Sequence, residues 1–307
     1  MRENRDGVLY ALNYGRVAAV HLDPVEKKPL FHFYPGHTIL SFGTFGCNLA
    51  CAFCQNWSIS QEDAPTRPVA PEELARLAEE CRQEDGSCVG VAFTYNEPGM
   101  WFETILDAAP LCRRRGLKVA MVSNGYLSPE PLRDLVAVVD AFNIDVKAMN
   151  RGFYTRVCRG TLEPVLAAVE AIRAAGRHVE VTHLVIPGEN DREEDFRRLV
   201  DWLAGVGEDI PLHLSRYHPA YRMTRPPTPT ATLERFREIA RERLRYVYLG
   251  NTWRPGDDDT CCHACGRRLI ARDGFFVTAL DLDGDRCPAC GTRLAGVGLA
   301  EARVSGR

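Results

Sequence analysis

The stretch Gly46-Cys47-Asn48-Leu49-Ala50-Cys51-Ala52-Phe53-Cys54 places three cysteines on one short loop, directly after an apolar run at residues 39–42. Three thiolates at this C-x3-C-x2-C spacing can hold three corners of a cubane iron–sulfur cluster, which takes four cysteines when protein alone binds it. One iron is then open to a ligand that is not protein. The spacing therefore favours a reactive centre over a closed electron-transfer cluster or a zinc knuckle.

The chain around this loop alternates short apolar runs with amphipathic helical repeats. One repeat places Leu74, Leu77, Ala78 and Cys81 at positions i, i+3, i+4 and i+7. The predicted strands are 39–42, 89–94, 117–122, 141–146, 179–186, 211–214 and 246–249. This alternation predicts an α/β fold with a parallel sheet, as a partial or full (β/α) TIM-like barrel or as an open doubly wound sheet. In either fold ligands lie at the C-terminal ends of the strands, where the cysteine loop begins.

Three units are expected along the chain. Residues 1–38 precede the repeat and contain a predicted β-hairpin of residues 8–11 with 17–21, around a turn at 13–15. Residues 39–251 form the β/α unit. Residues 256–307 open with the polar stretch Gly256-Asp257-Asp258-Asp259 and continue as a small cysteine-rich module.

Composition limits the class of protein. The 307 residues are 45% hydrophobic and 26% charged, with a formal net charge of −3. No strong field attracts the chain to nucleic acid or to a membrane surface, and no apolar run reaches the roughly 18 residues of a membrane span. Seven of the twelve cysteines lie in two tight clusters, which favours metal ligation in a reducing cytoplasm over disulfides.

The second cluster consists of two C-x2-C knuckles, each followed by glycine: Cys262, Cys265, Cys287 and Cys290. Four thiolates close a tetrahedral shell, as in a zinc ribbon or a rubredoxin-like site, and leave no open position. We expect zinc (Zn²⁺), with mononuclear iron as the alternative. Cys261 and His263 leave the first knuckle ambiguous by one ligand. The metal would supply stability that so small a core lacks.

The first motif, Cys47-x3-Cys51-x-Phe53-Cys54, resembles the signature of the radical SAM superfamily. Gly46 and Gln55-Asn56-Trp57 resemble its activating-enzyme branch, typified by pyruvate formate-lyase activase. A closer resemblance, to the radical SAM enzyme of the AmmeMemoRadiSam system, rests on residues 23–32, Tyr95-Asn96-Glu97-Pro98, Ser123-Asn124-Gly125, Asp145-Val146-Lys147 and Ser215-Arg216-Tyr217-His218-Pro219. Members of that group carry a further cysteine-bearing segment before the Arg-Glu-Asn stretch. We expect this chain either to lack it or to have been assigned a late start.

The resemblance implies that Cys47, Cys51 and Cys54 ligate a 4Fe-4S cluster whose open iron binds S-adenosylmethionine (SAM). One electron, delivered by a low-potential donor such as flavodoxin or ferredoxin, then breaks the sulfonium S–C5′ bond. The products are methionine and a 5′-deoxyadenosyl radical, which abstracts a hydrogen atom from a substrate. The cofactor carries the chemistry and the protein positions it.

The resemblance also assigns the surroundings of SAM. Glu97 is expected at the methionine ammonium, and Asp145 with Lys147 at the carboxylate. The full expected set is Phe53, Glu97, Ser123, Asn124, Asp145, Lys147, His183, Ile186 and His218. Each assignment has a purely structural alternative. Glu97 could be a carboxylate that favours a helix start, and Asp145 with Lys147 could be a structural ion pair. His183 and His218 could be structural histidines. Tyr95 and Asn96 stand where the superfamily usually has two glycines.

Substrate identity is left open by the sequence. The branch implies a protein or peptide substrate, such as a glycyl radical enzyme, whereas the AmmeMemoRadiSam group implies companion proteins and a different, unassigned modification. A non-catalytic iron–sulfur and zinc electron carrier or scaffold is the alternative from another class. Nucleic-acid modification would need a basic face that the cysteine-rich module does not display.

Overall fold

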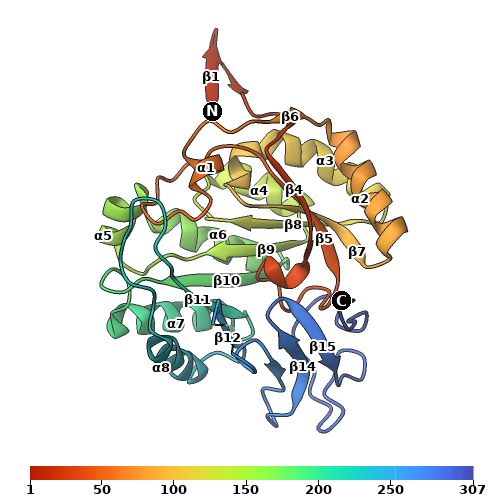
Figure 1. Ribbon diagram of the computed structural model, residues 1–307, viewed down its shortest axis with the longest axis vertical. Coiled ribbons are helices and arrows are strands. Elements are labelled where there is room, and N and C mark those ends of the chain that lie inside the picture. The colour runs from red at the N-terminus through yellow and green to blue at the C-terminus, as the bar shows by residue number, and fades with distance from the viewer. Residues whose placement is uncertain (253, 307) are drawn as a thin grey trace.

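The computed structural model of the protein describes residues 1–252 and 254–306. Its centre is an eight-stranded sheet in the order β12-β11-β10-β9-β8-β7-β5-β4 (Figure 1). The strands are β4 (Ala19–Pro24), β5 (Thr38–Gly43), β7 (Cys88–Phe93), β8 (Lys118–Ser123), β9 (Ala141–Asp145), β10 (His178–Val185), β11 (Leu212–Arg216) and β12 (Val247–Gly250). All pairs are parallel except β4 with β5. Within the described residues no pairing joins β12 to β4, so the barrel is the partial, open form.

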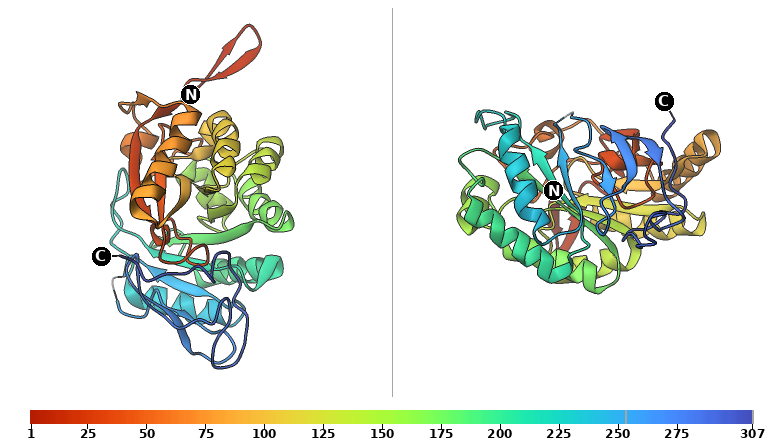
Figure 2. Two further views of the ribbon diagram at one scale, coloured as in Figure 1. Left: turned by 90° about the vertical axis from the view of Figure 1, so that its right-hand side faces the viewer. Right: turned by 90° about the horizontal axis from the view of Figure 1, so that it is seen from below.

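Six helices cover the outer face of this sheet (Figure 2). They are α2 (Pro71–Asp85), α3 (Phe102–Arg114), α4 (Pro129–Val138), α6 (Glu163–Ala174), α7 (Glu193–Gly207) and α8 (Thr230–Arg241). Helix α2 shows why they form where they do, because Pro71 opens it and Gly86, at φ +65°, ends it in the left-handed conformation. Its apolar stripe, with Leu74 and Ala78 fully buried, packs into the main core between helices and sheet. Shorter helical segments are α1 (Trp57–Ser60), α5 (Arg151–Phe153), two 3₁₀ turns (Val25–Lys27 and Pro98–Trp101) and a π-helix (Tyr154–Cys158).

The concave face of the sheet is lined by small and polar residues. Ala92, Ala120 and Ala141 leave room there for the segment of residues 25–37, which buries Leu30 and Phe33 against them. Fully buried Glu180 on β10 anchors this segment through backbone donors: Phe31 N donates to its Oε2 at 3.0 Å and His32 N to its Oε1 at 2.7 Å. The segment therefore closes the N-terminal half of the barrel interior and leaves the C-terminal half open.

The C-terminal module is a three-stranded antiparallel sheet of β13 (Thr260–Cys261), β14 (Arg268–Asp273) and β15 (Phe276–Leu280). It packs against the 25–37 segment, at the end of the molecule away from the N-terminal hairpin (Figures 1 and 2). Arg272 reaches across this boundary: its guanidinium donates to Phe31 O at 2.9 Å and lies 3.4 Å from Glu26 Oε1. The limits of 1–38, 39–251 and 256–307 stay predictions, and Arg307 lies outside the described residues.

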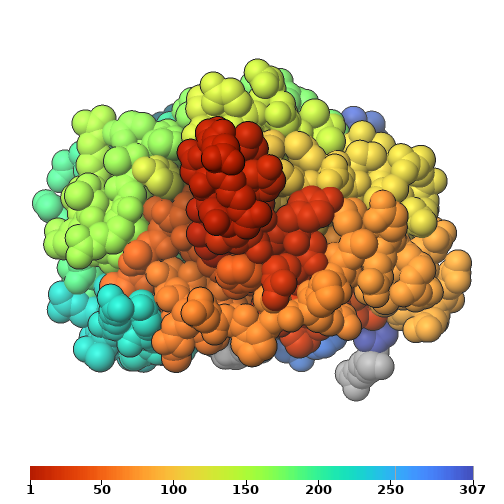
Figure 3. Space-filling view, turned by 90° about the horizontal axis from the view of Figure 1, so that it is seen from above, coloured from red at the N-terminus to blue at the C-terminus, as the bar shows by residue number. Residues whose placement is uncertain are grey.

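The predicted N-terminal hairpin is present, but its expected pairing is wrong. Strand β2 (Val8–Ala11) pairs with the preceding β1 (Arg2–Arg5), around Asp6 and Gly7 at φ +50° and +85°. An Asp-Gly turn of this kind is the preferred two-residue hairpin connection, and it outweighs the looser signal at residues 13–15. Residues 17–21, the expected partner, instead lie in β3 (Arg16–Val17), paired with β6 (Arg67–Pro68), and in β4 of the main sheet. The hairpin projects from the body of the molecule (Figures 1 and 2), and in the view from above it lies over the face toward the viewer (Figure 3).

None of the helices in the described part of the chain combines the length and apolarity that a membrane span requires.

Replacing Arg272 by methionine should lower the free energy of unfolding by about 3–5 kcal/mol, because Glu26 would be left buried and unpaired. Denaturant unfolding followed by circular dichroism measures the change. Arg268→Met is the matched control, since Arg268 is exposed and its ion pair with Asp259 is worth less than about 1 kcal/mol. Equal losses in the two variants would contradict the anchoring role of Arg272.

Candidate functional site

A cavity of about 530 Å³ opens at the C-terminal ends of the strands. Its walls contain Cys47, Cys51 and Cys54 together with six of the nine side chains predicted around SAM: Phe53, Glu97, Ser123, Asn124, Asp145 and Lys147. A larger, mostly apolar groove of about 930 Å³ lies between α4 and α6 on the outer face and is lined by no cysteine. The cavity is therefore the candidate active site.

The cysteine loop is held by its neighbours rather than by a regular element of its own. Ala50 N donates to Cys158 O at 2.9 Å and Ala52 N to Val157 O at 3.0 Å, so the loop rests on the C-terminal end of the π-helix. Gly46 enters the loop at φ +88°, a conformation that glycine adopts without strain. The backbone on either side of Cys51 is thus fixed by a hydrogen bond to the π-helix.

The donor set of the loop fits a cluster better than a single ion. Among the described residues, the C-terminal cysteines are the group whose ligand atoms lie close enough together for a single ion, and the three loop sulfurs do not form such a group. Burial raises the pKa of the Cys47 thiol to about 12, with a further contribution from the negative charge of Glu97. A thiol in such surroundings becomes a thiolate when a cation coordinates it, and iron supplies that charge.

Glu97 joins the ends of two neighbouring strands. Its Oε1 accepts hydrogen bonds from Gly99 N at 2.7 Å and from Ser123 Oγ at 2.8 Å, and its Oε2 accepts one from Asn124 N at 2.8 Å. Burial raises the pKa of Glu97, and these three hydrogen bonds oppose the rise. The carboxylate fixes residues 123–125 against the start of the turn Pro98–Trp101. Ser123, one of the residues predicted around SAM, uses its hydroxyl to hold Glu97.

Asn124 connects the end of β8 to the cysteine loop. Its Nδ2 lies 3.5 Å from Cys47 Sγ and donates to Asn48 Oδ1 at 2.8 Å, while its Oδ1 accepts from Tyr126 N at 2.8 Å. Asn48 donates in turn to Tyr126 O at 2.6 Å. Sequence reasoning missed Asn48, although its place directly after the first cysteine was the available signal.

Asp145 and Lys147 form an ion pair at the end of β9, with Lys147 Nζ 2.8 Å from Asp145 Oδ2. Lys147 Nζ also stands 5.8 Å from the ring centre of Phe53, the residue before the last loop cysteine. Burial lowers the pKa of Lys147, but Asp145 and the thiols of Cys51 and Cys158 more than offset this and hold it well above its usual value. Lys147 thus lines the cavity together with the three loop cysteines.

Three predicted residues are not brought into the cavity. His183 points into the helical layer, where its Nδ1 lies 2.8 Å from Val146 O and its ring packs on Phe196. Strand alternation explains this, because Thr182 and Leu184 on either side of it line the cavity. Ile186 is fully buried in the main core, and half-buried His218 does not line the cavity. Alternation along β10 was the signal that would have selected Thr182 and Leu184.

Sequence reasoning also missed a charged group at the cavity. Lys28 is only 2% exposed, and its Nζ donates to Asp23 Oδ2 at 2.6 Å and lies 4.5 Å from the ring centre of Tyr95. Asp23 Oδ1 accepts a second bond, from Lys27 Nζ at 2.8 Å. Tyr95 has φ +73°, so this tyrosine adopts the backbone conformation that the usual glycine would provide.

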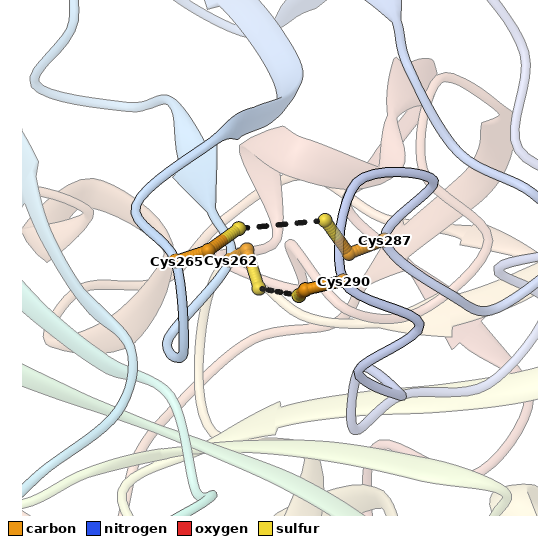
Figure 4. Close-up of side chains that lie close together, drawn as sticks. All are labelled: Cys262, Cys265, Cys287 and Cys290. Carbon is orange, nitrogen blue, oxygen red and sulfur yellow. Dashed lines mark hydrogen bonds between the residues drawn. The ribbon is translucent and has the colours of Figure 1, made fainter.

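The second candidate site is the C-terminal cysteine group, a metal centre in its geometry. The ligand atoms of Cys262, Cys265, Cys287 and Cys290 lie within 4.8 Å of one another (Figure 4). Sγ atoms are 3.6 Å apart between Cys262 and Cys290, and 3.7 Å apart between Cys265 and Cys287. A tetrahedron with metal–sulfur bonds of about 2.3 Å has edges of roughly 3.8 Å, so the four sulfurs fit one ion.

The two knuckles share one backbone pattern. Gly266 N donates to Cys262 O, and Gly291 N to Cys287 O, both at 2.8 Å. Each glycine has a positive φ, +77° and +71°, which lets the chain turn back sharply beside the four sulfurs. Neither of the two ambiguous ligands joins the group: Cys261 is exposed on β13, and His263 Nδ1 faces Tyr246 OH at 3.1 Å.

Comparison with known proteins agrees with this geometry. The model of the radical SAM superfamily matches residues 42–203. The uncharacterized protein MJ0808 of Methanocaldococcus jannaschii is 42% identical over 301 residues, covering 95% of this chain and 88% of its own. The pyruvate formate-lyase-activating enzyme of Clostridium pasteurianum is 27% identical, covering 56% of this chain and 72% of its own. The chain belongs to the radical SAM superfamily, a superfamily of enzymes, and is similar to its activating-enzyme branch.

Solved structures share the fold at low sequence identity. Streptococcus suis SuiB bound to S-adenosylmethionine superposes with a TM-score of 0.56 at 13% identity, covering 74% of this chain and 53% of SuiB. A radical SAM methyltransferase from Sphaerobacter thermophilus gives 0.55 at 21% identity, covering 77% of this chain and 71% of its own. These likenesses confirm the predicted β/α fold.

Cys287→Ser should remove the ion of the C-terminal group, because a buried ligand is lost from the tetrahedral shell. Metal analysis of protein purified without reconstitution should fall from one zinc or iron ion at this site to none, with a lower melting temperature. Cys261→Ser should keep the ion, since Cys261 lies outside the group. Loss of the ion in both variants would show that the ligand set is wrong.

Proposed function

We propose that the protein cleaves SAM reductively to methionine and a 5′-deoxyadenosyl radical, and abstracts a hydrogen atom from a substrate. The observation that carries the proposal is the meeting of Cys47, Cys51 and Cys54 with Glu97 and Lys147 in one cavity. A cluster that only transfers electrons needs no carboxylate and ammonium placed beside it to bind the amino and carboxylate groups of SAM. The superfamily match over residues 42–203 supports the same reading.

The cavity residues have distinct roles in this proposal. Cys47, Cys51 and Cys54 hold the 4Fe-4S cluster, which when bound supplies the electron for SAM cleavage. Lys147, oriented by Asp145, offers its ammonium to the carboxylate of SAM. Among the described residues, Glu97 Oε2 accepts one hydrogen bond, from Asn124 N, so it retains the capacity to accept a second from the methionine ammonium.

A protein or peptide is the substrate class that we propose. Among similar proteins, several are named pyruvate formate-lyase-activating enzymes, and SuiB has been solved with its precursor peptide SuiA. A glycyl radical enzyme activase is the narrower alternative, and the presence of a glycyl radical enzyme in the same genome separates it from an unassigned modification made with companion proteins. The electron donor would be a flavodoxin or ferredoxin. We also propose a cytoplasmic location, because the twelve cysteines are free and thiols stay reduced in that compartment.

Anaerobically reconstituted protein, reduced in the presence of SAM, should release 5′-deoxyadenosine, and SAM should change the EPR spectrum of the reduced cluster. Cys51→Ala should lower product formation to background, because the cluster loses a ligand. Cys112→Ala is the control, since Cys112 is buried in the core on α3 and does not line the cavity. A cluster whose EPR spectrum ignores SAM would favour a non-catalytic carrier or scaffold instead.

A further inference from the structure

The floor of the cavity is built by the segment that enters the barrel from β4. Asp145 and Thr182 line the cavity, and Asn143 and Glu180 lie two positions earlier on the same strands, so they stand one layer deeper. This deeper layer binds the segment: Asn143 Nδ2 donates to Pro29 O at 2.8 Å, next to Lys28. Lys28 therefore stands at the level where the filled half of the barrel meets the open half.

The charges at this floor do not cancel. The Asp23 carboxylate accepts hydrogen bonds from Lys27, Lys28 and the Tyr95 hydroxyl, which gives one negative and two positive charges in contact. An ammonium has three N–H donors, and Lys28 uses one of them on Asp23. Asp23, Lys27 and Lys28 together thus carry a net charge of about +1. Of the other charged residues that line the cavity, Lys147 is neutralised by Asp145, and Glu97 is the carboxylate assigned above to the methionine ammonium.

Backbone strain at Tyr95 maintains this arrangement. A positive φ is a genuine outlier for a bulky aromatic residue, and such strain costs of order 1–3 kcal/mol. In this backbone conformation the ring of Tyr95 lies against Lys28 Nζ, and its hydroxyl donates to Asp23. Both contacts hold the ammonium in place, because the ring face attracts a cation and the hydroxyl fixes the counter-ion.

We propose that Lys28 binds a carboxylate of the substrate at the floor of the cavity, with Asp23 and Tyr95 as positioning residues. The inference rests on the proposed function and narrows its substrate class to peptide-like carboxylates, at a chain terminus or on an acidic side chain. The net charge of +1 on the group of Asp23, Lys27 and Lys28 matches a monoanion. Lys28 would then place the substrate on the concave side of the cavity, below the level of Asp145.

The chain has only four lysines, Lys27, Lys28, Lys118 and Lys147, so lysine labelling can follow each one separately. Reconstituted protein with SAM is treated with acetic anhydride, and peptide mass spectrometry gives the acylation rate at each position. N-acetylglycine should slow acylation of Lys28 at least fivefold at saturation, and N-acetylglycinamide, which lacks the carboxylate, should not at equal ionic strength. Lys118, at the N-terminal end of β8 outside the cavity, should react equally in all samples.

The same assay distinguishes the source of the carboxylate. N-acetylaspartate α-amide carries it on a side chain, and the probe that protects Lys28 at lower concentration identifies the source. Protection by the neutral amide as well, protection by no probe, or a Lys28 that never reacts would each overturn the proposal.

A pair of variants gives an independent measurement. Lys28→Met should weaken N-acetylglycine binding at least tenfold by calorimetry, and Lys118→Met should leave it within twofold. If Lys28→Met does not fold, the labelling of the wild-type protein still decides the question. Failure of SAM cleavage is recognised separately, because wild-type protein would then release no 5′-deoxyadenosine whatever the labelling shows.

Discussion

The buried carboxylate of Glu180 holds the interior of this open barrel together. It receives two backbone N–H groups from the 25–37 segment, and its oxygens lie 2.9 Å from His178 Nε2 and 2.6 Å from His213 Nε2. Burial alone would raise the pKa of Glu180, but the bonds from these two histidines hold it well below its usual range. A parallel sheet that does not close must fill its concave face. Here one charged group ties the filling segment to two adjacent strands.

Two sites follow from this one constraint. On one side of the 25–37 segment, Lys28 lines the cavity. On its other side, the segment forms the surface against which the C-terminal module packs. His32 shows the second contact, because its Nε2 lies 2.6 Å from Tyr248 OH, which in turn lies 2.9 Å from Thr260 Oγ1. The cysteine loop and the tetrahedral cysteine group therefore lie on opposite sides of the same segment. A metal bound in the module would stabilise the floor of the site and take no place within it.

The parts of the structure that depend on local pattern could be predicted from sequence. All seven predicted strands are present, and their observed ends lie within two residues of the predicted ends. Short apolar runs rich in β-forming residues between amphipathic helices have few other ways to fold. Both cysteine groups were found because ligand spacing is itself local. His183 and the register of the hairpin show the limit. The face of β10 that is directed inward depends on tertiary packing. The pairing partner of residues 8–11 depends on the turn at Asp6 and Gly7, which competes with the turn expected at residues 13–15. Lys28 lies in the stretch 23–32 that carries the family resemblance, but nothing local assigns it a role, and only the fold brings it to Tyr95.

The four C-terminal sulfur ligands differ in their access to solvent: Cys262 and Cys287 are buried, whereas Cys265 and Cys290 are exposed. A chelator or a competing ion can reach the outer pair without unfolding the module. Incubation with excess iron and sulfide, the treatment that would load a cluster on the first cysteine loop, would thus also exchange an ion bound by these four cysteines. The ion present in freshly isolated protein, before any such treatment, is the one that reports what the cell supplied.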